Sequence, residues 1–370
     1  MTSILLEDKS IENFEKAVLA LQKNSSSIII LACDKNNFEQ QLLNPILKQA
    51  TIPIIGGIFP AIVYKNRQYD QGTILLGLNN TLKVTTVHHI SKDREYDEII
   101  AEEMGLLNQD VKTMFLFFDG ISKNIDSIIQ SLFNNFGLTI NYIGGAAAGR
   151  DFQKKPILFS NEGLLEDAAL LATSTSASTI GVKHGWQPIE KATHQITKSD
   201  GKLIYELDYK PAFGTYKKII EAHAGKPLDQ EEFFQAAKSY PLGISRLSGD
   251  NIVRVVNGVT DEGALFCTGD IVENTSIQIL HATNAQLVQA AEQASLLSHN
   301  THYQTSFKLY IGCLARLLVM GENFYKEIDA IYEEDELLIG ALSVGEIANN
   351  KDHYLEFYNS TAVVAKIADV

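Results

Sequence analysis

Continuous apolar runs alternate along this chain with stripes of apolar residues that have helical spacing. Residues 27–33 and 113–118 are uninterrupted apolar or β-rich runs, a pattern typical of strands buried on both faces. Residues 11–21 and 125–136 place their apolar side chains on one side of a helix. The alternation predicts an α/β (or α+β) fold, with mixed β-sheets and flanking helices.

One unit of this pattern recurs. A strand and a helix lead to a second strand with the core Ile54-Ile-Gly-Gly-Ile, Tyr142-Ile-Gly-Gly-Ala or Leu338-Ile-Gly-Ala-Leu. Glycine lets the chain turn with positive φ, or lets another group come close. We interpret these glycines as turns that lead into a third strand. The sequence therefore predicts repeated β-α-β-β units, used at least three times, in two closely packed lobes.

Composition and charge limit the class of protein. The length of 370 residues favours two domains. The formal net charge of −14 argues against a nucleic-acid partner, since phosphate contacts need clustered Lys and Arg. Three widely spaced cysteines suggest reduced thiols. With no signal-peptide pattern and no apolar run of about 20 residues, we expect a cytoplasmic protein without membrane insertion.

Short motifs are spread over residues 27–365. They are Pro53-Ile-Ile-Gly-Gly-Ile-Phe-Pro60, Phe118-Asp-Gly120, Tyr142-Ile-Gly-Gly-Ala146, Gly181-Val-Lys-His-Gly-Trp186, Glu206-Leu-Asp-Tyr-Lys-Pro-Ala212, Tyr240-Pro-Leu-Gly243, Gly345-Glu-Ile-Ala348 and Tyr358-Asn-Ser-Thr361. In their order and coverage these motifs resemble those of the FIST family, a family of sensory proteins named for an N-terminal and a C-terminal FIST domain.

The resemblance implies a FIST N-terminal domain over residues 27–224 and a FIST C-terminal domain over residues 225–365, one in each lobe. It also implies a small ligand, with amino acids proposed, and a signal passed to a separate partner such as a histidine kinase, a cyclase or a chemoreceptor. No output module is recognised before residue 27 or after residue 365, so we expect a stand-alone sensor. Ligand binding would favour one lobe arrangement, which the partner would detect.

Polar residues near the last glycine-containing strand are the candidate ligand-binding residues. The planar guanidinium of Arg316 suits a ligand carboxylate, although it could instead pair with an acidic residue of the protein. Glu346 could hold an ammonium group, and Asn349 or Asn359 could bond polar ligand atoms beside Gly345. The alternative is that Glu346 and Asn359 only satisfy backbone groups of a turn.

One branch of the family resembles haem proteins that sense nitric oxide. His184 could serve as an axial haem ligand with Trp186 as a pocket wall, or it could simply bond the backbone at a strand end. Cys313 is a weaker candidate for a reactive or metal-binding residue, because buried thiols are usually inert.

No phosphate-binding loop, nucleophile elbow or His-Glu-x-x-His motif is present in the sequence. We therefore expect a non-enzymatic sensor with no cofactor, and no catalytic or metal-binding residue. A haem-based nitric oxide sensor, an interaction scaffold and an unrecognised hydrolase-type enzyme that uses Glu346 and His184 stay as alternatives. The sequence leaves open whether the pocket lies within one lobe or between the two.

Overall fold

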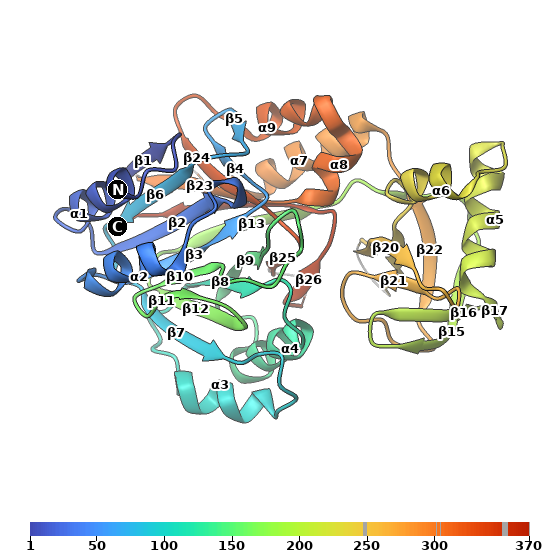
Figure 1. Ribbon diagram of the computed structural model, residues 1–370, viewed down its shortest axis with the longest axis horizontal. Helices are drawn as coiled ribbons and strands as arrows, with labels where there is room; N and C mark the ends of the chain where they lie inside the picture. The colour runs from blue at the N-terminus through green and yellow to red at the C-terminus, as the bar shows by residue number, and fades with distance from the viewer. Residues whose placement is uncertain (247–249, 301, 304, 350–353, 370) are drawn as a thin grey trace.

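The computed structural model describes residues 1–246, 250–300, 302–303, 305–349 and 354–369. Its strands form three six-stranded sheets and one nine-stranded sheet. The three six-stranded sheets make up a body, and the nine-stranded sheet belongs to a smaller lobe at one side (Figure 1). The prediction of mixed sheets with flanking helices is confirmed.

The body contains three copies of one unit, which is the predicted repeat extended by a leading strand with its helix and by closing strands. The first copy consists of β1 (Thr2–Leu6), α1 (Ile11–Leu21), β2 (Ser27–Cys33), the 3₁₀ turn η1 (Asp34–Asn36), α2 (Gln40–Gln49), β3 (Ile54–Phe59), β4 (Ala61–Tyr64), β5 (Arg67–Tyr69) and β6 (Thr73–Leu78). The second copy consists of β7 (Lys83–His88), α3 (Tyr96–Met104), β8 (Thr113–Asp119), α4 (Ile125–Phe136), β9 (Asn141–Ala147), β10 (Leu158–Ser160), β11 (Gly163–Leu165) and β12 (Ala168–Ser174).

The third copy has the same order of elements, with a long insertion after its first strand. It consists of β13 (Ser178–Lys183), α7 (Asn284–Ser298), β23 (Ser306–Cys313), α8 (Leu314–Met320), the 3₁₀ turn η2 (Gly321–Phe324), α9 (Tyr325–Ile331), β24 (Leu337–Ser343), β25 (Glu346–Ala348), β26 (Glu356–Tyr358) and β27 (Ala362–Ala368). The sequence pattern predicts a single helix from Cys313 to Tyr332. That helix is divided where Gly321 takes a φ of 53°, a left-handed conformation that ends an α-helix.

Each copy gives one hairpin to a neighbouring copy. The sheets are centred on the parallel pairs β2–β3, β8–β9 and β23–β24. The hairpin that follows each pair joins another sheet: β4–β5 pairs with β24, β10–β11 with β3, and β25–β26 with β9. All three sheets consequently have equivalent strand orders, and no copy completes a sheet by itself.

The repeated glycines lie inside strands rather than in turns. Gly56, Gly144 and Gly340 belong to β3, β9 and β24, the second strands of the parallel pairs. A Cβ atom at any of them would overlap a backbone carbonyl oxygen of the paired strand. Close approach of another group, and not a turn, is therefore the reason for glycine here.

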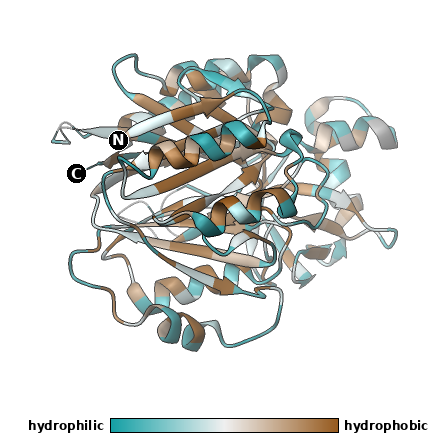
Figure 2. Cartoon of the chain, turned by 60° about the vertical axis from the view of Figure 1, so that its left-hand side comes forward, coloured by the Kyte–Doolittle hydropathy of each residue, from teal (hydrophilic) through white to brown (hydrophobic). Residues whose placement is uncertain are grey.

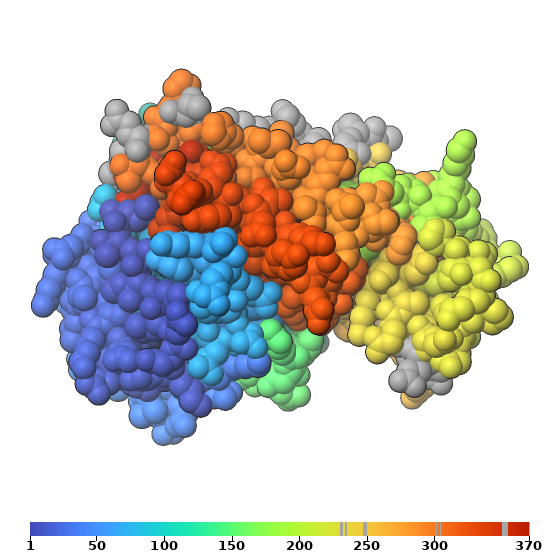
Figure 3. Space-filling model, turned by 90° about the horizontal axis from the view of Figure 1, so that it is seen from above, coloured from blue at the N-terminus to red at the C-terminus, as the bar shows by residue number. Residues whose placement is uncertain are grey.

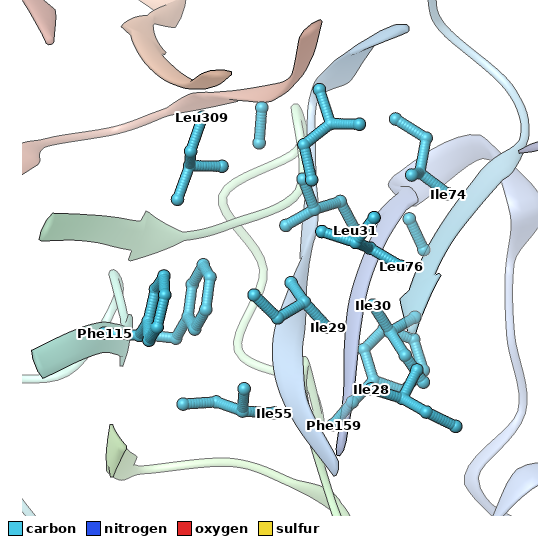
Figure 4. Close-up of a cluster of buried hydrophobic side chains, with 14 of the residues drawn as sticks. Ile28, Ile29, Ile30, Leu31, Ile55, Ile74, Leu76, Phe115, Phe159 and Leu309 are labelled. Carbon is cyan, nitrogen blue, oxygen red and sulfur yellow. The ribbon is translucent and has the colours of Figure 1, made fainter. Parts of the chain in front are cut away.

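One apolar cluster fills the space among the three body sheets. Ile29 and Ile55 come from the first sheet, Phe115 from the second and Leu309 from the third (Figure 4). Alternate residues of the same strands face outward and are covered by helices, α3 and α4 on one sheet and α7 to α9 on another. Apolar residues follow the strands while the helices have mixed surfaces (Figure 2), so the strands are buried on both faces, as their continuous apolar runs predict.

The smaller lobe is an insertion between β13 and α7, with its own apolar core. Its elements are β14 (Gln187–Pro188), β15 (His194–Asp200), β16 (Leu203–Leu207), β17 (Lys210–Pro211), α5 (Ala212–Ala224), α6 (Gln230–Ala237), β18 (Leu242–Ile244), β19 (Ile252–Arg254), β20 (Val256–Val259), β21 (Leu265–Cys267) and β22 (Ser276–His281). Figure 3 shows the lobe beside the body, and both ends of the chain belong to the body. The domain boundary predicted at residues 224 and 225 falls inside this lobe, after α5, so the observed lobes do not coincide with the predicted domains.

None of the helices in the described residues is long and apolar enough to cross a membrane.

Gly144→Ala should destabilise the protein by about 3 kcal/mol or more, because the new methyl group would displace the paired strand at Leu116. The free energy of unfolding in urea would measure the loss. Gly214→Ala is the control. Gly214 lies in α5, and a methyl group added there would meet no atom within 4 Å beyond its chain neighbours and the backbone of its own helix, so alanine should stabilise the helix by up to about 1 kcal/mol. Equal effects at the two positions would contradict this account of the glycines.

Candidate functional site

A cavity of about 760 Å³ lies between the body and the inserted lobe. Its body side includes the beginnings of α4 and α8 and the segment before β27, and its lobe side includes β20 and β21. Apolar side chains from both sides line it together with a few polar groups, the composition expected of a small-molecule site. A second cavity of about 750 Å³ lies on the lobe beside α5, and no predicted site residue lines it.

Asn359 is the predicted site residue that lines the cavity between the lobes. Its side chain is 1% exposed, and its Nδ2 donates to the carbonyl oxygen of Tyr358 at 2.9 Å. The Oδ1 atom has no hydrogen-bond partner among the described residues. A buried acceptor without a partner costs about 1–3 kcal/mol, so an N–H group of a ligand at this point would remove that cost.

Glu346 lies directly behind the cavity wall. Its carboxyl group is fully buried and accepts hydrogen bonds from Ser343 Oγ at 2.8 Å and from the backbone N–H of Thr361 at 3.1 Å. The thiol of Cys313, which does line the cavity, also bonds to it. Burial raises the pKa of Glu346 to about 8, against the lowering effect of these hydrogen bonds. The hydrogen bonds of this carboxyl group to Ser343 and Thr361 hold the turn that contains Asn359.

Arg316 is fully buried and lies outside the cavity lining. Its Nε and Nη2 atoms donate to the carboxylate of Glu327 at 2.7–3.1 Å. The other N–H groups donate to backbone carbonyl oxygens: those of Nη1 to His184 and Ser360, and the second one of Nη2 to Leu287. Every N–H group of the guanidinium therefore has an acceptor within the protein. This arrangement agrees with the alternative of an arginine paired with an acid, and the carboxylate-binding role of Arg316 stays a prediction.

Asn349, Gly345 and Trp186 also lie outside the cavity lining. Asn349 joins β25 to the start of β9, accepting from the N–H of Tyr142 at 2.8 Å and donating to the carbonyl of Ile140 at 3.1 Å. A side chain at Gly345 would overlap the ring of Phe357. Trp186 is buried, and its indole N–H donates to the carbonyl and hydroxyl oxygens of Ser360 at 3.0 and 3.1 Å. Ligand roles for these residues stay predictions.

His184 has a buried ring with one nitrogen bonded to the backbone, and its role as a haem ligand stays a prediction. Its Nδ1 accepts the backbone N–H of Trp186 at 2.9 Å, so the neutral ring must carry its proton on Nε2. Burial lowers the pKa of His184 to about 4, which keeps the ring neutral. A metal-bound histidine normally donates its other N–H, and here that nitrogen accepts. In the part of the chain that is described, no group of three or more His, Cys, Asp or Glu could hold a metal ion.

The sequence interpretation did not identify the residues that join the lobe to the body beside the cavity. Arg254 of β19 is 5% exposed, and its Nη1 donates to the carbonyl oxygen of Phe357 at 2.9 Å. Its Nη2 lies 3.8 Å from Oδ1 of Asp126 in α4. Its Nε atom has no partner among the described residues. Burial among the cavity walls raises the pKa of Asp126. The sequence does place Arg254 inside the apolar run of residues 252–256, and a charged residue in such a run could have indicated a buried contact.

The fold and the cavity define an α/β protein of three repeated units with exchanged hairpins and one inserted lobe. The chain belongs to the FIST family: residues 27–210 match the FIST N domain and residues 212–349 match the FIST C domain. FIST domains are associated with sensory signal transduction. The boundary between the matches lies near residue 211, before the one predicted at residues 224 and 225.

An uncharacterized protein of Methanocaldococcus jannaschii is 28% identical to this chain over 179 residues. The similarity covers 45% of this chain and 34% of that protein, so the chain spans about a third of the length of this relative.

Glu346→Gln should flatten the dependence of stability on pH. Between the ordinary glutamate pKa of 4.5 and the folded-state pKa of about 8, the folded protein keeps a proton that the unfolded chain has released. The free energy of unfolding should therefore fall as pH rises through this window, by about 1.4 kcal/mol per pH unit. Urea unfolding at several pH values would measure the slope. Glu15→Gln, on the exposed side of α1, should leave the slope unchanged, and equal slopes in wild type and Glu346→Gln would refute the assignment.

Arg316→Met should cost about 3–5 kcal/mol of stability, because it leaves the carboxylate of Glu327 buried without its charged partner. The double variant Arg316→Met with Glu327→Met should recover part of that loss, since no buried charge remains. Denaturant unfolding would compare the two. Lys16→Met, which breaks the exposed Lys16–Glu12 pair, should change stability little; a double variant less stable than Arg316→Met would contradict the prediction.

Proposed function

We propose that this protein is a sensory ligand-binding protein, and that an amino acid or a related molecule occupies the cavity between the body and the inserted lobe. The observation that carries the proposal is Asn359, which lines the cavity and whose Oδ1 atom has no hydrogen-bond partner among the residues that the structure describes. Asn359 is 1% exposed, and a buried acceptor of this kind suits a ligand that brings an N–H donor.

The charges around the cavity support a ligand with both an anionic and a cationic or N–H-bearing end. Lys202 and Lys238 line the cavity, as do Asp126 and Asp270, so the charged side chains of the lining balance. This lining of two ammonium groups, two carboxyl groups and the Asn359 acceptor is complementary to a zwitterion.

We propose binding without catalysis. The hydrolase-type alternative requires Glu346 and His184 to act together, yet Glu346 bonds Ser343 and Thr361 while His184 bonds Trp186. A ligand in contact with both lobes stabilises one arrangement of them only to the extent that it bonds differently in each. A separate partner protein would detect that arrangement.

A thermal-shift screen of the common amino acids tests the proposal. A ligand at 100 times its dissociation constant should stabilise the protein by about 2.7 kcal/mol, and Asn359→Ala should weaken that effect because the acceptor is lost. Asn24→Ala is the matched control, since Asn24 is an exposed asparagine in the loop after α1. Stabilisation that survives in Asn359→Ala would place the ligand elsewhere, and no stabilisation by any amino acid or amino-acid derivative would reject the proposed ligand class.

A further inference from the structure

The cavity is larger than a free amino acid requires. Its volume of about 760 Å³ lies within the range of about 300–1,000 Å³ that is typical of sites for drug-sized ligands. Asn359, the candidate acceptor of an N–H, belongs to the body wall, whereas Lys202 and Lys238, which could bond a carboxylate, belong to the lobe. A free amino acid bonded to these groups would fill only part of a cavity of this size.

The unfilled part is apolar and reaches the surface. Phe152 of the body, Leu318 of α8 and Phe266 of β21 all line the cavity and are 54%, 58% and 43% exposed. Phe152 has a φ of 51°, a left-handed conformation that costs a non-glycine residue energy. Three large apolar side chains from three separate segments therefore leave apolar surface uncovered around one cavity.

We propose, building on the function above, that the ligand is an N-acylated amino acid. Its amide N–H would bond Asn359 Oδ1, and its carboxylate would lie toward the ammonium groups of Lys202 and Lys238. Its acyl chain would extend along Phe266 and Leu318 toward Phe152. One polar head thereby meets the polar groups of the lining, and one apolar chain covers the apolar surface.

An acyl chain fits this surface better than a peptide does. Each further residue of a peptide brings a backbone N–H and a C=O that need partners when buried. The side chains of Phe152, Phe266 and Leu318 offer none. A methylene chain needs no partner and gains free energy from each apolar contact.

The experiment is a chain-length series measured by isothermal titration calorimetry on the full-length protein. The ligands are free alanine and its N-acetyl, N-butanoyl, N-hexanoyl and N-octanoyl derivatives, with trialanine for comparison. Affinity should rise about fourfold for each added methylene until the chain leaves the cavity. Leu318→Ser should weaken octanoyl-alanine binding several-fold while leaving acetyl-alanine binding unchanged. Leu296→Ser is the matched control, because Leu296 is an exposed leucine of α7 outside the cavity lining.

The outcomes separate this inference from the proposed function. An affinity that does not change with chain length, with free alanine binding as well as the acyl derivatives, would overturn the acyl chain and keep the amino-acid site. Trialanine binding more tightly than octanoyl-alanine would overturn it in favour of a peptide. Equal losses in Leu318→Ser and Leu296→Ser would also count against it. Failure of every compound here, together with failure of the amino-acid screen, would reject both proposals.

Discussion

The exchange of hairpins among the three body sheets is the constraint on which the rest of this structure depends. β3 completes its sheet with β10 of the second copy, β9 with β25 of the third, and β24 with β4 of the first. The three copies therefore form a closed ring in which each depends on another. The ring also explains why the FIST N and FIST C matches do not correspond to separate lobes: the body takes strands from both.

The three copies also show which residues the fold itself requires. In the strand pairing between copies, Glu346 lies opposite Gly145. The equivalent pairs in the other two sheets are Leu158 with Gly57 and Ile62 with Ala341. Leu158 and Ile62 are buried in the common apolar core, so the position accepts an apolar side chain in two of three copies. A fully buried carboxyl group with a raised pKa is unfavourable for folding. Its presence beside the cavity in the third copy is therefore explained better by function than by the fold.

The sequence pattern was sufficient for the repeated unit because the strands are buried on both faces and the glycines recur at a fixed place within them. The exchange of hairpins could not be predicted from it, because pairing partners far apart in sequence leave no local pattern. The inserted lobe was hidden for the same reason: the link between β13 and α7 occupies residues 184–283, where the first copy uses only residues 7–10.

The candidate site was predictable on its body side alone. Asn359 stood out as a polar residue beside an apolar strand, whereas Lys202, Lys238 and Asp270 reach the cavity only because the lobe folds over the body. Arg316 shows how tertiary packing decides between the two alternatives that the sequence left open. Its residue type suits a ligand carboxylate, but tertiary packing surrounds it with the acceptors of Glu327 and of three backbone carbonyl groups.

Those same contacts connect the cavity to the point where the chain enters the lobe. The carbonyl of Ser360, next to Asn359, accepts from the indole of Trp186 and from Arg316, which also holds the carbonyl of His184. Residues 184–186 link the last body strand before the insertion, β13, to the lobe. Ser360 has a φ of 50°, so its carbonyl is held in a conformation that other residues of the turn must maintain. A ligand bonded to Asn359 would act one residue away from this junction. A difference in ligand contact would thus be passed to the lobe through backbone hydrogen bonds, without requiring Arg316 to touch the ligand.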